Sequence, residues 1–364
     1  MTAPCRSVHE FRRRRATVRH SLIKAAAVSS VAALSLAACG GSDSTGDSTS
    51  AEGGSGSDVK ACLAYDVGGR GDQSFNDSAA KGLDKAKDEL KVETAEVEAS
   101  QGENDAARED RLNQLIESGC TDIIAVGYIY AKAVGGAAKE NSDIQFAIID
   151  DASEDSAGEN VAQLTFAEEQ GSYLVGAAAA LKSKSNKVGF IGGVDVPLIN
   201  KFQAGFEAGA KAVNPDIEVS TKYLAEDGSG FADPAKGQTA AEGMYDNGAD
   251  VVYHAAGGSG SGVFKAAKAA KKMAIGVDSD QALTAEEDVR DVILTSMVKN
   301  VDVAVFDHIK AVTEGDMQSG NIIFDLKAGG VDYSTTGGKV DDIKDKLDGY
   351  KQEIVDGKVT VPTK

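Results

Sequence analysis

Histidine and the common catalytic motifs are scarce. The chain has four histidines in 364 residues, and only His254 and His308 lie beyond residue 58. His-Glu-x-x-His, Cys-x-x-Cys and Gly-x-Ser-x-Gly, which carry metal, redox and serine chemistry, are all missing. The Gly-rich run 257–262 lacks the Gly-Lys-Ser/Thr ending of a phosphate-binding loop, and residues 66–77 lack the spacing of a calcium loop. We interpret both histidines as structural and expect no catalytic residue, no cofactor and no metal.

Basic residues are also scarce: the chain has 38 Lys and Arg against 57 Asp and Glu, and its net charge is −19. Residues 1–38 hold seven of the basic residues and one of the acidic ones, so the remaining chain has 31 against 56 and a net charge of −25. Such an acidic body argues against nucleic acid and anionic lipid head groups as partners. Apolar residues make up 42%, an ordinary globular proportion that excludes wholesale disorder.

The first 38 residues are typical of a secretory signal: a basic stretch followed by an apolar run of small residues. That run ends in Leu-Ala-Ala-Cys-Gly, which resembles a bacterial lipobox and predicts lipidation of Cys39. Residues 39–58 are almost entirely small and polar and indicate a flexible tether. We therefore expect attachment to the extracytoplasmic face of the cell membrane through the N-terminal lipid only. The alternative is an ordinary cleavage site and a secreted soluble protein.

Two cysteines remain in the body, Cys62 and Cys120, in a compartment that permits disulfides. Cys62 lies at the start of one predicted strand and Cys120 immediately precedes another. If those strands are parallel neighbours, the two thiols lie at the same edge of the sheet and can form a disulfide. The alternative is a pair of buried free thiols.

Apolar runs alternate with helical patterns along the body. The runs predict strands over 61–67, 92–99, 121–127, 145–150, 161–166, 187–192, 218–224, 250–255, 274–277, 292–297 and 321–326. The spacing predicts helices over 78–90, 108–118, 168–182, 202–213, 234–247, 299–313 and 340–356. Two successive rounds of this α/β pattern favour two doubly wound parallel-sheet lobes, and the alternative is one long sheet.

Carboxylates, glycines and aromatic residues collect where the predicted strands end, and ligands of parallel sheets bind at that edge. The candidates are Asp66, Phe75, Asn76, Asp150, Phe231, Gly257, Gly258, Asp278 and Lys299. Aromatic faces can sandwich a ring and carboxylates accept hydrogen bonds from hydroxyls, so a neutral, planar, hydroxylated ligand fits. The alternatives are core positions for the phenylalanines, helix caps for the aspartates and a solvated surface position for the lysine.

Several runs in this order resemble signatures of the basic membrane protein (BMP) family of substrate-binding lipoproteins, which includes purine nucleoside receptors. They are Asp-Gln-Ser-Phe-Asn-Asp-Ser at 72–78, Val-Gly-Phe-Ile-Gly-Gly at 188–193, Phe-Gln-Ala-Gly-Phe at 202–206, Tyr-His-Ala-Ala-Gly-Gly at 253–258, Gly-Val-Asp-Ser-Asp-Gln at 276–281 and Thr-Ser-Met-Val-Lys at 295–299. The resemblance covers essentially all of residues 59–364. Gly71 and Gln73 depart from the first signature, where acidic and lysine residues are frequent, which affects fine specificity.

The resemblance implies a type I periplasmic-binding-protein fold, with three crossing strands, a ligand cleft between two lobes, and delivery to an ABC permease. We expect lobe 1 over 59–167 and 298–320, and lobe 2 over 168–297 and 321–364. Two aromatics sandwich the base in nucleoside-binding members, and Phe75 and Phe231 match them. Acidic and lysine side chains hold base and ribose, which implies these roles for Asp150, Asp278 and Lys299.

The sequence therefore predicts a monomeric substrate-binding lipoprotein of an ABC importer that binds nucleosides, in particular purine nucleosides, and is not an enzyme. One alternative is a binder of another small neutral solute, such as a sugar, on the same fold. Another is a surface lipoprotein that senses a ligand without importing it.

Overall fold

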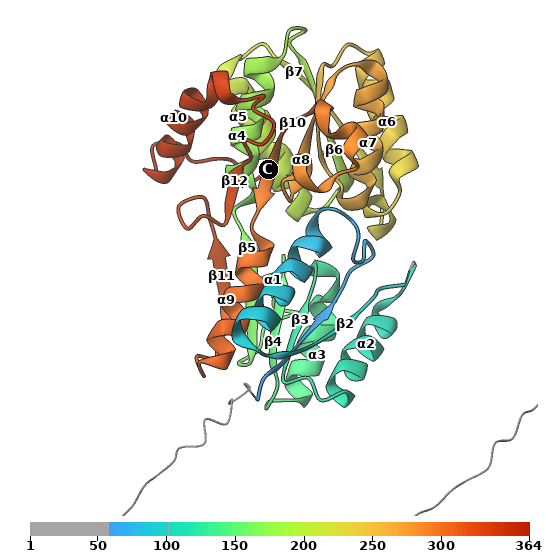
Figure 1. The fold of residues 1–364 in the computed structure, drawn as a ribbon, viewed down its shortest axis with the longest axis vertical. Helices are drawn as coiled ribbons and strands as arrows, with labels where there is room; N and C mark the ends of the chain where they lie inside the picture. The colour runs from blue at the N-terminus through green and yellow to red at the C-terminus, as the bar shows by residue number, and fades with distance from the viewer. Residues whose placement is uncertain (1–57, 101) are drawn as a thin grey trace, which may run out of the picture. The chain divides into compact units, whose positions relative to one another are not determined.

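A computed structural model describes residues 58–100 and 102–364. The expected signal peptide, Cys39 and nearly all of the tether lie outside the described residues. Within the described ranges, no helix is both long and apolar enough to cross a lipid bilayer. This part of the chain forms two six-stranded sheets with helices packed on them (Figure 1). The two-lobe α/β prediction is confirmed, and the single long sheet is excluded.

The sheet of lobe 1 has the order β11-β5-β4-β3-β1-β2, and every neighbouring pair is parallel. Strands β3 and β4 are buried at every position, as expected where helices cover both faces. The strands are β1 Lys60–Ala64, β2 Glu93–Val97, β3 Asp122–Ala125, β4 Gln145–Ile149, β5 Val161–Phe166 and β11 Gly320–Phe324.

Alternate residues of β1 contact helices on opposite faces of this sheet. Leu63 belongs to the cluster that contains Leu83 of helix α1, whereas Cys62 belongs to the cluster that contains Leu112 of α2. This is the two-residue period of a strand with two buried faces. The helices of lobe 1 are α1 Phe75–Leu90, α2 Asp105–Glu117, α3 Ala131–Glu140 and α9 Val301–Thr313.

The sheet of lobe 2 has the order β12-β10-β9-β8-β6-β7 and is parallel except for the β10–β12 pair. Its strands are β6 Lys187–Val194, β7 Glu218–Ala225, β8 Val251–Ala255, β9 Met273–Asp278, β10 Ile293–Lys299 and β12 Val331–Tyr333. Its helices are α4 Glu168–Lys182, α5 Pro197–Val213, α6 Pro234–Asp246, α7 Gly260–Ala270, α8 Gln281–Thr284 and α10 Lys344–Val355.

Two of the expected lobe boundaries differ from the sheets. Strand β11 lies in the first sheet, paired with β5, although we expected residues 321–364 in lobe 2. Strand β10 stays in the second sheet as far as Lys299, although we expected lobe 1 to resume at 298. The physical reason is that β5 would otherwise have an unpaired edge, and β11 provides its parallel partner. The chain therefore completes the first sheet with β11 before it returns to the second sheet to form β12. Figure 1 shows β11 beside β5 and α9 beside α1.

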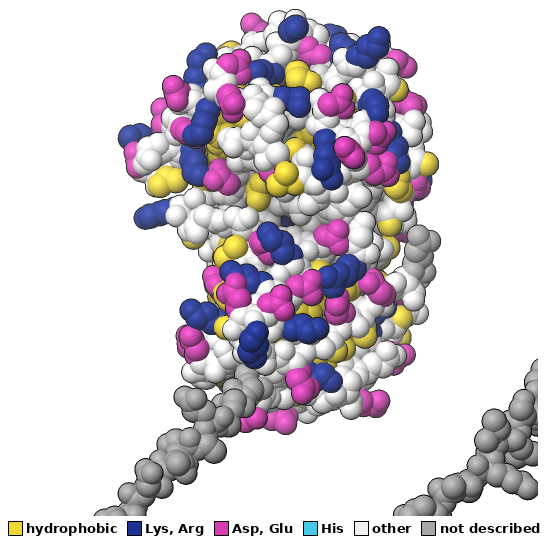
Figure 2. Space-filling view, in the orientation of Figure 1, with side chains coloured by type: hydrophobic (Ala, Val, Ile, Leu, Met, Phe, Trp, Pro, Cys, Tyr) yellow, Lys and Arg dark blue, Asp and Glu magenta, His cyan; other side chains and the backbone are white. Residues whose placement is uncertain are grey.

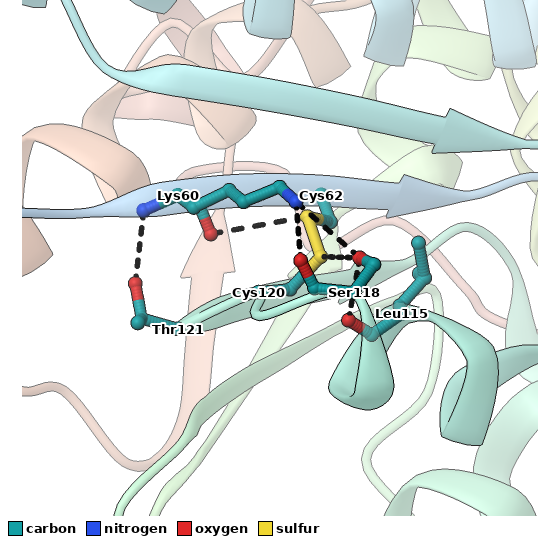
Figure 3. The surroundings of a disulfide bond; sticks show 6 residues. All are labelled: Lys60, Cys62, Leu115, Ser118, Cys120 and Thr121. Carbon is teal, nitrogen blue, oxygen red and sulfur yellow. Dashed lines mark hydrogen bonds between the residues drawn. A yellow bond between two sulfur atoms is a disulfide. The ribbon is translucent and has the colours of Figure 1, made fainter.

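A disulfide joins Cys62 of β1 to Cys120, which lies just before β3 (Figure 3). The two strands are parallel neighbours, and the Cα atoms of the two cysteines are 6.1 Å apart. Both cysteines are buried. The predicted disulfide is confirmed, and its cause is the strand pairing that places both residues at the same edge.

Candidate ligand-binding site

A cavity lies between the carboxyl ends of the two sheets. Its walls come from both lobes, as the rule for parallel sheets predicts. The lining residues are Asp66, Gly68, Asp72, Phe75, Asn76, Gly127, Tyr128, Asp150, Leu198, Ile199, Phe202, Phe231, Ala255, Gly257, Val277, Asp278 and Lys299. Eight of the nine residues that we selected from the sequence line this cavity, and Gly258 is the exception.

The central cation of the cavity is Lys299, the last residue of β10. Its ammonium donates to Oδ2 of Asp150 at 2.6 Å and lies 3.6 Å from Oε1 of Glu168. Burial opposes the charge of Lys299, but the carboxylates of Asp150, Glu168 and Asp278 outweigh burial and raise its pKa. The lysine therefore stays protonated, and the solvated surface alternative does not hold, because its side chain is only 2% exposed.

Aromatic rings surround the same ammonium. Nζ of Lys299 lies 4.8 Å from the ring centre of Phe75, 5.2 Å from that of Phe166 and 5.5 Å from that of Phe202. Such distances permit cation–π attraction, which is strongest where water is excluded. The three rings therefore stabilise the buried charge, and two of them, Phe75 and Phe202, also line the cavity.

Glu168 forms a second layer behind the lysine. It begins α4 at the crossing between the lobes, is fully buried, and its Oε2 lies 3.1 Å from Nζ of Lys201 on α5. Burial raises the pKa of Glu168 to about 7. In the sequence this residue looks like an ordinary acidic residue in a first helical turn, so no pattern distinguishes it.

A hydrogen-bonded group on the lobe 1 side of the cavity consists of Asp66, Asp72 and Asn76. Oδ1 of Asp66 accepts from Nδ2 of Asn76 at 2.7 Å and from the Gly68 amide at 3.1 Å. Burial raises the pKa of Asp66 to about 7. Asp72 accepts from the amides of Ser74 and Asn76, both at 2.9 Å, and so satisfies the start of α1. Asp72, rather than Asp66, therefore accepts the amide hydrogens at the start of α1, whose N-cap residue is Ser74.

The two predicted aromatic residues are half-buried and line the cavity from different lobes. Phe75 begins α1, and Phe231 ends the short turn 228–231 of lobe 2. Gly193 gives Phe231 its room, because a Cβ there would lie 2.4 Å from the ring. A purely core role for these rings therefore does not hold.

Six apolar or aromatic lining residues escaped the sequence selection: Tyr128, Leu198, Ile199, Phe202, Ala255 and Val277. Leu198 and Ile199 were missed because we expected the helix to begin at 202, whereas α5 begins at Pro197. A proline is favoured in the first turn of a helix and could have marked this start. Tyr128 follows a predicted strand, so the same strand-end rule could have found it.

The surface differs from this cavity in its charge arrangement. On the face drawn in Figure 2, Lys and Arg side chains are interspersed with Asp and Glu. His254 is not among the lining residues; it packs edge-on against Phe264, with ring centres 5.1 Å apart. Burial lowers the pKa of His254 to about 4, so the ring is neutral at physiological pH.

Similarity to known proteins extends over the whole folded body. Residues 60–364 match the Bmp family model, described as ABC transporter substrate-binding protein PnrA-like. A CD4+ T-cell-stimulating antigen of Listeria innocua is 39% identical over 345 residues, which cover 90% of this chain and 94% of that protein. The ABC transporter nucleoside-binding protein BmpA of Lactococcus lactis subsp. cremoris is 36% identical and covers 94% of this chain and 98% of its own length.

Solved structures agree with this assignment. An ABC transporter solute-binding protein from Aeropyrum pernix has a TM-score of 0.73 and 29% identity, covering 84% of this chain and 94% of that one. A solute-binding protein from Conexibacter woesei, at 23% identity and a TM-score of 0.68, shares the fold. The chain belongs to the Bmp family of PnrA-like ABC transporter substrate-binding proteins.

Proposed function

We propose that this substrate-binding protein takes a nucleoside, in particular a purine nucleoside, into the cavity between its lobes and delivers it to an ABC permease. The observation that carries the proposal is the pair of half-buried rings, Phe75 and Phe231, on walls from different lobes. A flat base held between them buries both of its faces. The Lactococcus relative, a protein named as nucleoside-binding, supports the same class of ligand.

Polar groups beside the rings suit the rest of a nucleoside. The Asp278 carboxylate is an acceptor for ribose hydroxyls, and charge strengthens such hydrogen bonds. Lys299 uses one ammonium hydrogen on Asp150, so it has others to donate to a ligand. Asn76 and Asp66 line the cavity together with Phe75, and we assign them to the edge of the base.

The charge of the cavity favours a neutral ligand over a phosphorylated one. Asp66, Asp72, Asp150 and Asp278 line it, and among the described residues Lys299 is the only cation that does so. A phosphate would lie among these carboxylates in a region of low dielectric, where repulsion is strong. We therefore propose that nucleosides bind and nucleotides do not.

Binding without catalysis completes the proposal. A ligand that contacts both lobes favours the closed arrangement and is held by hinge closure. We propose that Cys39 carries the lipid, that the monomeric body stays on the extracytoplasmic face, and that the importer's permease is its partner.

Calorimetric titration of the full chain in detergent tests this function. Adenosine, guanosine, inosine, uridine, adenosine monophosphate, ribose and galactose form the panel. We expect micromolar or tighter binding of purine nucleosides, no response to ribose or the monophosphate, and recovery of each ligand unchanged. Binding of galactose or ribose alone would favour a sugar-binding protein, and turnover of a bound nucleoside would establish an enzyme.

A further inference from the structure

Ser74 of lobe 1 reaches across the cleft to Asp278 of lobe 2. Its Oγ lies 2.7 Å from Oδ2 of Asp278 and 3.3 Å from the carbonyl oxygen of Val277. Ser74 is fully buried and Asp278 is 6% exposed. Asp278 lines the cavity, whereas Ser74 is not among the lining residues. The serine therefore touches the carboxylate without facing the space that a ligand would fill.

The backbone on both sides of this contact is held in place by lobe 2. Oγ of Ser279 donates to the carbonyl oxygen of Ser74 at 2.9 Å. Nε2 of Gln281 and Oγ1 of Thr284 donate to the carbonyl oxygen of Gln73 at 3.0 and 3.1 Å. Gln73 has a φ of 57°, a conformation that is unusual for a side chain other than glycine. Three side chains of lobe 2 thus fix the backbone that carries the hydroxyl group of Ser74.

The contact leaves one oxygen of Asp278 for a ligand. Within the described residues, Ser74 is the only group that donates to this carboxylate, and it donates to Oδ2. Oδ1 is therefore the oxygen available to the cavity, and its direction is set because the partner of Oδ2 is fixed. An oriented carboxylate needs no reorganisation when a hydroxyl group arrives, which favours binding.

Titratable groups from three other elements act on Asp278. Burial raises its pKa to about 6; Lys299 and the Ser74 hydroxyl act to lower it, and Asp150 and Asp72 act to raise it. The hydroxyl group of Ser74 therefore also favours the ionised acceptor form at neutral pH.

We propose that Ser74 is a positioning residue that orients the Asp278 carboxylate toward the hydroxyl groups of the ligand. Ser74 of lobe 1 then reaches Asp278 of lobe 2 only when the cleft is closed. Recognition of the ligand's hydroxyl groups is thereby coupled to closure of the lobes. This inference rests on the proposed function, because it requires a hydroxylated ligand in the cavity.

The test compares Ser74→Ala with a matched control, Ser78→Ala, in the full chain. Ser78 is also a buried serine of this segment, but its hydroxyl accepts from the Asp302 amide on α9 and does not contact Asp278. Calorimetry is run with adenosine and with 2′,3′-dideoxyadenosine, which lacks the 2′ and 3′ hydroxyl groups of the ribose. Because the lost hydrogen bond is made to a charged group, we expect Ser74→Ala to weaken adenosine binding about tenfold. The dideoxy compound should change less than about twofold, and Ser78→Ala should leave both affinities near wild type.

Adenosine affinity measured as a function of pH gives a second test. A serine with a purely structural role would not change the pH at which affinity falls. Removing the hydroxyl raises the pKa of Asp278, so the loss of adenosine affinity on acidification should begin at higher pH in Ser74→Ala. Equal losses for the two ligands, or an unshifted profile, would overturn the positioning role. Wild-type protein that binds no ligand of the panel would instead refute the proposed function, and the inference would fall with it.

Discussion

Lys299 and Asp150 form a buried ion pair between the two sheets, with Nζ 2.6 Å from Oδ2. Lys299 ends β10 in the second sheet, and Asp150 follows β4 in the first. Because both side chains line the cavity, the same contact joins the lobes and shapes the binding space.

Replacing the lysine by an apolar residue of similar length tests this joint role. Lys299→Met leaves Asp150 and Glu168 buried without their shared cation, and breaking a buried pair destabilises by about 3–5 kcal/mol. We expect a lower urea midpoint and at least a 100-fold loss of nucleoside affinity, with roughly 3 kcal/mol lost from binding. The control is Lys81→Met, whose side chain is 75% exposed in its pair with Asp302 and should change both by little. Unaltered binding in Lys299→Met would remove the lysine from the site.

The second stacking ring is tested by Phe231→Ala. Loss of one aromatic face should weaken purine nucleoside binding by about 1–3 kcal/mol, the usual range for base stacking. Phe306→Ala is the control, because this ring of α9 packs under Lys85 of α1 and does not line the cavity. If the two variants bind adenosine equally well, the base is not held against Phe231.

Asp66→Asn should change how stability depends on pH in the ligand-free protein. The folded pKa of Asp66 is raised from 3.8 to about 7, so the native state holds this proton more tightly than the unfolded state does. Between pH about 4 and 7 the group therefore lowers stability as pH rises, by at most about 1.4 kcal/mol per pH unit. Asparagine keeps the oxygen that accepts from Asn76 and Gly68 but cannot ionise.

Urea unfolding at several pH values measures the effect. The stability of Asp66→Asn relative to wild type should increase from pH 5 to pH 8. Asp84→Asn, at a side chain that is 51% exposed, should show no such trend. A constant difference between Asp66→Asn and wild type would contradict a raised pKa at this position.

Removing the disulfide should reduce stability without reducing affinity. Cys62 and Cys120 are 58 residues apart, and closing a loop of that length contributes about 4 kcal/mol in the chain-entropy model. The double variant Cys62→Ala/Cys120→Ala should therefore unfold at lower temperature, while nucleoside affinity stays constant because neither cysteine lines the cavity. Reductant should lower the midpoint of wild type alone, and equal midpoints with and without reductant would show that the bond does not stabilise the fold.

Local apolar patterns were enough to predict most strands and the helices that follow them. Helix α3 was missed because Ala131–Glu140 is rich in alanine and contains Gly135 and Gly136, which obscure an amphipathic pattern. Strand β12 has only three residues, too few to show a period. The sheet that receives β11 depends on pairing with a distant strand, and no local pattern encodes that choice.

The residues at predicted strand ends correctly indicated the cavity, because parallel strands finish at a common edge of the sheet. That rule depends on the sheet topology and not on any sequence motif. The contacts behind the lining residues were not predictable in the same way. In the sequence Glu168 looks like a solvated residue of a first helical turn, and only the packing of α4 on α5 buries it against Lys201. Ser74 appears within a family signature, but its partner Asp278 is 204 residues away.

The pairing of β11 with β5 also sets the order in which the protein can be completed during synthesis. The first sheet acquires its last strand at Gly320–Phe324, after all strands of the second sheet except β12 have been made. A nascent or truncated chain that stops before this point leaves one edge of β5 unpaired, a template for association with another chain. Each lobe is therefore built from more than one segment of the chain, and neither can be produced by a single cut.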